Sequence, residues 1–155
     1  MPGGRVETVT MKTLILLLWV GILALSGCEG GTKTTLRSRC NSTDGPNVCT
    51  VTLVSIEGGV YRYDVKNSSF WPGTNAVEVT VRISVEKGTL QVWLEDPQRN
   101  KTIVGVEPGQ TAEIKGTAWV TGISERSFSV YFEPLGEGEA KRAENVQAEI
   151  RYNTP

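Results

Sequence analysis

Between Val77 and Val85, apolar and polar side chains alternate at every position. Valine and isoleucine occupy the odd positions, and glutamate, threonine, arginine and serine occupy the even ones. Successive side chains of a β-strand point to opposite faces of its sheet. The two-residue period therefore predicts a strand with one face in a core and the other in water.

Shorter and weaker versions of this alternation occur elsewhere in the chain. They predict further strands at residues 48–56, 59–65, 90–94, 112–120, 128–132 and 146–152. Gly58-Gly59 lies between the first two of these segments and favours a two-residue hairpin turn. Turn-forming pairs such as Asp96-Pro97 and Pro108-Gly109 separate later segments. We expect an all-β fold, an antiparallel two-sheet β-sandwich of about eight strands over residues 36–155, with a helical turn only at 139–145.

The N-terminal part of the chain has a different pattern. Residues 14–25 are uncharged and apolar, and Lys12 precedes them. A helix of that length reaches roughly 18 to 23 Å, which is shorter than the ~30 Å hydrocarbon core of a membrane. The pattern is typical of a signal helix rather than a membrane span. Met11 is a more natural start for such a signal than Met1.

The residues at the end of this apolar run, Leu25-Ser26-Gly27-Cys28, resemble the lipobox of bacterial lipoprotein precursors. The resemblance implies cleavage before Cys28, a diacylglycerol on its thiol and a further acyl chain, such as palmitate, on its amino group. It implies a signal peptide at 1–27, a lipidated tether at 28–35 and a location on the extracytoplasmic side of a membrane. In a Gram-negative organism Glu29 implies the outer membrane. The alternative is an ordinary cleaved signal in which Cys28 is incidental.

The chain contains three cysteines. If Cys28 carries lipid, Cys40 and Cys49 remain as a pair, and Asp44-Gly45-Pro46 between them is a strong turn signal. We therefore expect a disulfide, which the oxidising envelope would preserve and which is worth roughly 2.5 to 3 kcal/mol. A metal or redox pair is the alternative, but the spacing is wide for that chemistry.

Composition narrows the classes of function. Histidine, the usual general base and the commonest metal ligand, is absent from the sequence. The sequence motifs of catalytic serine nucleophiles, zinc sites, phosphate-binding glycine loops and EF-hands are absent too. The formal net charge is −1, and no basic run is present. We expect no enzymatic activity, no cofactor, no metal and no nucleic-acid partner.

Glu95 and Asp96 are the remaining candidates for carboxylate chemistry. Neighbours in a strand point to opposite faces, so we expect a solvated strand end and a turn initiator rather than a catalytic pair. A calcium site that included Asn100 would need oxygen ligands from elsewhere. Glycosylation triplets begin at Asn41, Asn67 and Asn100, all in expected loops. Chance matches are the preferred interpretation, and glycans are the alternative.

Three large aromatic side chains fall on the polar faces of predicted strands. If the apolar residues of 90–94 face the core, Trp93 faces outward, and the same phase places Trp119 and Tyr131 outward. Aromatic rings beside hydrogen-bonding groups are typical of sugar-binding or interface surfaces. The alternative is a bulge that reverses the phase, or rings that pack across strands to cover the sheet. Trp71 is expected to plug one end of the core.

These expectations favour a membrane-anchored lipoprotein that binds or scaffolds an envelope protein or a polysaccharide at the cell envelope. The first alternative is a carbohydrate-binding module with Trp93, Trp119 and Tyr131 on its binding face. A carboxylate-based hydrolase is the second alternative.

Overall fold

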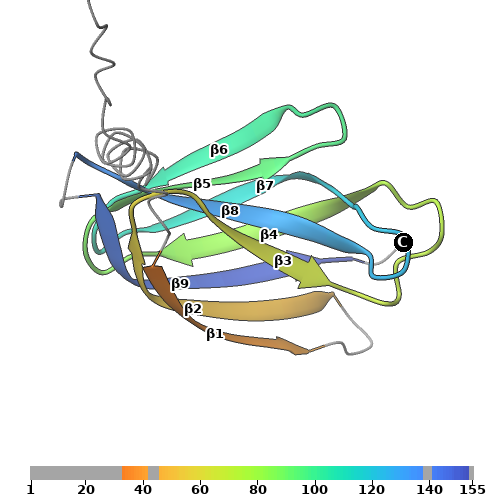
Figure 1. The fold of residues 1–155 in the computed structure, drawn as a ribbon, viewed down its shortest axis with the longest axis horizontal. Coiled ribbons are helices and arrows are strands. Elements are labelled where there is room, and N and C mark those ends of the chain that lie inside the picture. Colours follow the sequence, from red (N-terminus) through yellow and green to blue (C-terminus); the bar gives the residue numbers. More distant parts are fainter. Residues whose placement is uncertain (1–32, 42–45, 138–140, 154–155) are drawn as a thin grey trace, which may run out of the picture. The chain divides into compact units, whose positions relative to one another are not determined.

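The computed structural model describes residues 33–41, 46–137 and 141–153. This part of the chain forms nine strands: β1 (Lys33–Asn41), β2 (Asn47–Glu57), β3 (Tyr61–Lys66), β4 (Ala76–Ser84), β5 (Thr89–Glu95), β6 (Lys101–Val106), β7 (Thr111–Trp119), β8 (Ser127–Leu135) and β9 (Arg142–Tyr152). They make two antiparallel sheets, with strand orders β1-β2-β9-β4-β7 and β3-β8-β5-β6 (Figure 1). The predicted all-β, two-sheet sandwich is confirmed.

The predicted signal and lipidation site lie outside the described residues. These comprise the signal at 1–27, Cys28 and the tether as far as residue 32. Within the described residues, the structure contains no helix of the length and hydrophobicity that a membrane span requires.

The core fills the space between the two sheets. On β4 the alternation appears as predicted, because Val81 and Ile83 are fully buried while Arg82 between them is exposed. From the other sheet, β8 contributes Phe128 and Phe132, which are also fully buried. Burying one such side chain stabilises the fold by about 1.5–3 kcal/mol. A one-residue shift in the pairing register of a strand would turn all its buried side chains to the solvent face. The alternation therefore fixes which face of each strand points inward.

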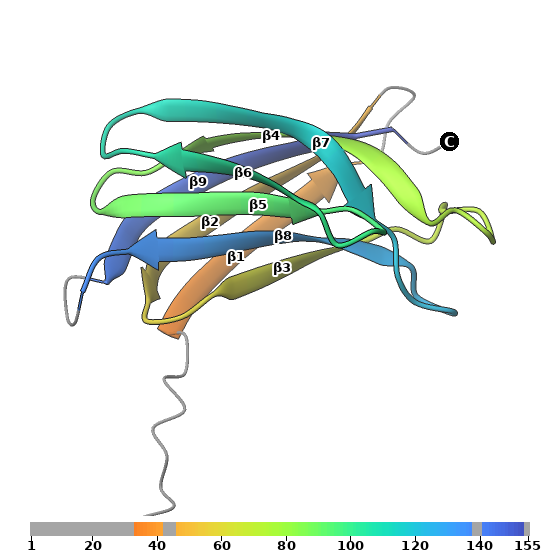
Figure 2. The same ribbon diagram turned by 90° about the horizontal axis from the view of Figure 1, so that it is seen from above.

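The two ends of the sandwich differ. At one end, Lys33 at the start of β1 lies opposite Glu57 at the end of β2. At the other end, Asn47 at the start of β2 lies opposite Tyr152 at the end of β9. Strands are connected at this second end by residues 67–75, 96–100 and 120–126 (Figure 2). We call it the loop end.

A disulfide joins Cys40 and Cys49, with an S–S distance of 2.04 Å. The two residues are direct partners in the β1–β2 pair. The predicted bond is therefore confirmed, and it cross-links the edge strand β1 to β2. Asn41, expected in a loop, is instead the last residue of β1, whereas Asn67 and Asn100 lie between strands.

The hairpin expected at Gly58-Gly59 is not formed. β2 pairs with β1 and β9, whereas β3 pairs with β8 in the other sheet. Gly58, with φ 83°, therefore turns the chain from one sheet to the other, and its N–H donates to the carbonyl of Lys141. The two glycines specify a sharp turn, but they do not specify which strands pair.

The helical turn expected at 139–145 is wrong where the structure describes it. β9 begins at Arg142 and runs through this segment, and Glu144 forms a bridge with Lys87. β9 lies between β2 and β4, so its backbone groups pair on both sides. That pairing and the burial of Ala143 outweigh a local preference for helix. Residues 139 and 140 lie outside the described residues.

Two strands were not predicted. β1 begins at Lys33, inside the expected tether, and β6 covers Lys101–Val106. Both are edge strands. Residues 35–41 of β1 are exposed, and Ile103 of β6 is half exposed. An edge strand with little buried surface does not need a regular apolar face, so it leaves a weak periodic signal.

Candidate ligand-binding site

Trp93 lies on the outer face of the four-stranded sheet, because Val92 and Leu94 beside it are fully buried in the core. Its side chain is nevertheless only 6% exposed. Tyr131, its direct partner in β8, stacks on it with ring centroids 5.2 Å apart. Lys101 Nζ lies 4.9 Å from the centroid of the indole ring. The expectation that Trp93 is open to solvent is therefore wrong, because cross-strand neighbours cover it.

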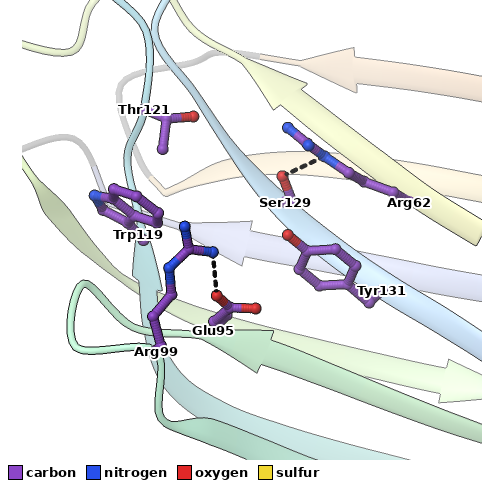
Figure 3. Close-up of a pocket in the computed structure, with 7 residues that line it drawn as sticks. All are labelled: Arg62, Glu95, Arg99, Trp119, Thr121, Ser129 and Tyr131. Carbon is purple, nitrogen blue, oxygen red and sulfur yellow. Dashed lines mark hydrogen bonds and ion pairs between the residues drawn. The ribbon is translucent and has the colours of Figure 1, made fainter. Parts of the chain in front are cut away.

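Trp119 and Tyr131 border one shallow depression of about 150 Å³ (Figure 3). Both side chains are partly exposed. Beyond Trp119, Thr121 forms a bridge with Ser127, so the chain crosses from one sheet to the other beside the depression. The other side chains that line it are polar: Arg62, Glu95, Arg99, Thr121 and Ser129. Two of the three predicted aromatic residues thus meet at this depression, and Trp93 does not line it.

Arg99 lies between Trp119 and Glu95 in Figure 3. Its Cζ lies 4.4 Å from the ring centroid of Trp119, within the range of a cation–π contact. One of its terminal nitrogens, Nη1, donates to Glu95 Oε1 at 2.6 Å. The ring and the carboxylate together fix the position of the guanidinium group.

The turn that carries Arg99 is built by Asp96. Asp96 Oδ1 accepts hydrogen bonds from the backbone N–H groups of Gln98 and Asn100, both at 2.8 Å. Its Oδ2 accepts one from the side-chain amide of Asn100 at 2.9 Å, which lowers the pKa of Asp96. Arg99 between them has φ 69°, a left-handed conformation that is uncommon outside glycine. The expectation that Asp96 initiates a turn is confirmed.

On the opposite side of the depression, Arg62 projects from β3. Its Nε donates to Asp64 Oδ1 at 2.6 Å and to Ser129 Oγ at 3.0 Å. The hydroxyl of Ser129 also donates to Asp64 Oδ1, at 2.7 Å. The hydrogen bond with Asp64 is the main cause that raises the pKa of Arg62. Neither terminal nitrogen of Arg62 bonds to any of the described residues.

The adjacent carboxylates Glu95 and Asp96 have separate roles. Glu95 lines the depression and pairs with Arg99, whereas both oxygens of Asp96 are used within its own turn. In the described ranges, no three cysteine, aspartate or glutamate side chains gather as metal ligands would. Asp96 therefore directs its oxygens at its own turn and Glu95 directs its carboxylate at Arg99.

Trp71 does not plug the core. Its side chain is 70% exposed, and Phe70 beside it is buried against Phe128 and Tyr152. The reason is a tight turn in which the N–H of Thr74 donates to the carbonyl of Trp71 at 3.0 Å. Pro72 and Gly73, which has φ 96°, occupy its centre, as in a type II turn. The plug is Phe70, one residue earlier than expected.

Four polar residues of the depression were not singled out from the sequence. Arg62 and Ser129 alternate with buried core residues of β3 and β8, so strand phase alone places them on the outer face. Arg99 and Thr121 lie in connections between strands. Their approach to Trp119 depends on how the two sheets meet, which no local pattern encodes.

No family model matches the sequence, and no curated protein matches it. Among solved structures, the chain is similar to peruvianin-I, a cysteine peptidase from Thevetia peruviana latex, with TM-score 0.39, 12% identity, and 77% of this chain and 64% of that chain covered. A family 11 carbohydrate-binding module from Clostridium thermocellum gives TM-score 0.37 and 8% identity, and the match covers 81% of this chain and 87% of that chain. A xylan-binding domain from Paenibacillus barcinonensis gives TM-score 0.34 and 11% identity, and the match covers 82% of this chain and 88% of that chain. The chain thus spans less than two thirds of the length of peruvianin-I.

Proposed function

We propose that the mature chain is a lipid-anchored, non-enzymatic binding module of the cell envelope, and that its ligand is a saccharide. One observation carries the choice of ligand. Two partly exposed aromatic rings, Trp119 and Tyr131, converge with hydroxyl, carboxylate and guanidinium groups on one depression. The membrane anchor is supported by the lipobox resemblance at Cys28.

The lining suits the two kinds of surface that a sugar ring presents. Its C–H face is apolar and packs against aromatic rings, and its hydroxyl groups exchange hydrogen bonds with polar side chains. Glu95 supplies acceptors, Arg62 and Arg99 supply donors, and Thr121 supplies a hydroxyl that does both. The volume of about 150 Å³ is smaller than the clefts of about 300–1,000 Å³ that enclose drug-sized ligands. It suits one unit of a longer chain that crosses an open surface.

A protein ligand is the second candidate, and the loop end supplies the observation that favours it. Trp71 is 70% exposed, and Ile123 on the neighbouring connection is fully exposed. The two connections are tied together, since the N–H of Val120 donates to the carbonyl of Asn75. Exposed tryptophans on such fixed segments are common centres of protein interfaces.

Titration calorimetry with a panel of soluble oligosaccharides, from β-glucan, xylan, chitin and pectin, tests the proposal on the full chain in detergent. We expect at least one to bind, and Trp119→Ala to weaken its binding roughly tenfold or more. Trp71→Ala is the matched control and should change the affinity by less than about twofold. If no oligosaccharide binds while native-membrane crosslinking from position 71 captures one defined protein, the protein candidate replaces this proposal.

A further inference from the structure

The depression holds N–H donors that have no acceptor among the described residues. Arg62 bonds to those residues through Nε alone, so the N–H groups of both its terminal nitrogens remain for a ligand. Arg99 gives one terminal nitrogen to Glu95 and keeps the other. Glu95, the carboxylate that lines the depression, accepts that bond through Oε1 and neutralises only part of this donor set. A ligand that brings acceptors of its own complements the remaining N–H groups.

We infer that the saccharide bound here carries a carboxylate, as a uronic acid does, and that Arg62 and Arg99 bind it. This inference rests on the proposed saccharide function. A guanidinium group presents parallel N–H donors that match the two oxygens of a carboxylate, and such charge-assisted bonds are roughly twice as strong as neutral ones. A neutral sugar offers only hydroxyl groups, each of which fits one donor at a time.

Arg99 is held in place before any ligand arrives. The turn organised by Asp96 sets its backbone, the ring of Trp119 supports its guanidinium plane, and Glu95 fixes one nitrogen. An unrestrained arginine loses considerable rotamer freedom when it binds a ligand. For Arg99, much of this loss of rotamer freedom has already occurred on folding. The left-handed φ of 69° belongs to the same fixed arrangement. Arg99 is therefore preorganised to bind an acceptor.

The local charge balance permits an anion. Arg62 forms an ion pair with Asp64 and Arg99 forms one with Glu95, so the charges of these four residues balance. A ligand carboxylate would meet no net negative charge, and the N–H groups it needs are those that the protein carboxylates do not use. The existing ion pairs can stay intact while the ligand binds.

A second charged surface provides a control. On the outer face of the five-stranded sheet, a depression without aromatic side chains is lined by Thr80, Arg82, Lys115, Arg151 and two carboxylates, Glu113 and Glu149. Glu113 pairs with Lys115 and Glu149 with Arg151, so the cations here are also partly balanced. General attraction of an acidic polymer would involve these cations as much as Arg62 and Arg99. Specific recognition would not involve them.

Calorimetry on the full chain in detergent tests the inference, with oligogalacturonate, oligoglucuronate and oligomannuronate as probes. Each is compared with its methyl ester, which keeps the sugar and removes the charge. We expect at least one acid to bind at least about tenfold more tightly than its ester, because the ester cannot form charge-assisted hydrogen bonds with the guanidinium groups. Arg62→Gln and Arg99→Gln should each reduce that preference to about twofold or less. Arg82→Gln should leave it unchanged.

Each other result overturns the inference in a distinguishable way. Equal binding of acid and ester, or binding of neutral oligosaccharides alone, rejects the carboxylate and leaves the saccharide proposal standing. A preference that survives in both arginine variants, or that Arg82→Gln also removes, places acid binding elsewhere on the protein. Failure of all the acidic and neutral sugars to bind rejects both proposals. Circular dichroism and the unfolding midpoint of each variant show whether it is folded.

Discussion

Trp93 and Tyr131 stack across the β5–β8 pair with their ring planes 6° apart and their centroids 5.2 Å apart. The two residues are nevertheless exposed to different degrees, because Trp93 is 6% exposed while Tyr131 is partly exposed and lines the depression. The indole ring of Trp93 thus packs against the phenol ring of Tyr131 across the two strands. It positions Tyr131 without itself forming part of the lining.

The stacking predicts that Trp93 contributes to stability. Trp93→Ala should lower the free energy of unfolding by about 3 kcal/mol or more, since it removes a large buried ring and the contact with Tyr131. Trp71→Ala, at a 70% exposed position, should change it by less than about 0.5 kcal/mol. Urea unfolding followed by circular dichroism measures both. Equal effects of the two substitutions would show that the indole of Trp93 is not packed as described.

Gly88 and Gly109 form a matched pair. Both have positive φ, 78° and 75°. A Cβ at Gly88 would lie 2.1 Å from the backbone oxygen of Arg142, whereas one at Gly109 would meet nothing within 4 Å. Gly109→Ala should cost about 1 kcal/mol for the left-handed backbone alone. Gly88→Ala should cost at least about 2 kcal/mol more, because the turn must also move away from β9. Similar unfolding midpoints for the two variants would contradict this.

The disulfide should stabilise the sandwich through the edge strand that it holds. Replacing Cys40 and Cys49 together by serine should cost roughly 3 kcal/mol, as expected for a ring of about ten residues. Non-reducing mass spectrometry of protein from the envelope should recover one linked peptide that contains both. Free thiols at these positions, or an unfolding midpoint unaffected by reductant, would count against the bond.

The turn at Asp96 should make stability depend on pH. The pKa of Asp96 is lowered by its bonds with Asn100, so its contribution is present above the ordinary value of 3.8 and is lost as the pH falls through the lower, folded-state value. The difference in urea midpoint between the wild type and Asp96→Ala should therefore be present near neutral pH and vanish in strong acid. A difference that stays constant over that range would indicate that the carboxylate charge is irrelevant to the turn.

Lipidation at Cys28 is predicted from the resemblance of Leu25-Ser26-Gly27-Cys28 to a lipobox. Metabolic labelling with a fatty-acid analogue should mark the wild type and the Cys40→Ser, Cys49→Ser double variant, but not Cys28→Ser. A label that survives Cys28→Ser, or a mature N-terminus at another residue, would reject the lipobox interpretation.

The main outlines of the fold could be predicted because one strong physical effect determines them. The alternation of apolar and polar side chains can be read without information from other segments of the chain. Residues 77–85 therefore predict both a strand and the face of it that points inward. The disulfide was predictable for a similar reason, since a strong turn signal between two cysteines brings them together whichever strands surround them. For these two features, the strand and the disulfide, short stretches of sequence were enough to predict the structure.

The rest depends on contacts that no local pattern contains. Strand phase places Trp93 on the outer face but cannot show that Tyr131 covers it. Gly58 marks a turn, but the pairing of β3 with β8 rather than β2 is decided by how both sheets fill the core. Arg99 reaches Trp119 only because two connections meet at the loop end. Tertiary contacts of this kind determine the candidate site.

The course of β1 has a mechanical consequence. With Cys28 anchored as proposed, the attachment enters the sandwich at Lys33, and Trp119 and Arg99 lie towards the opposite end. A tethered ligand that moves away would pull along β1, an edge strand whose backbone pairs with β2 among the described strands. Hydrogen bonds of an antiparallel pair run across the strands, so such tension would shear them all at once rather than open them one after another. Should they give way, the disulfide from Cys40 to Cys49 would pass the tension directly into β2 and keep it off the chain between the two cysteines.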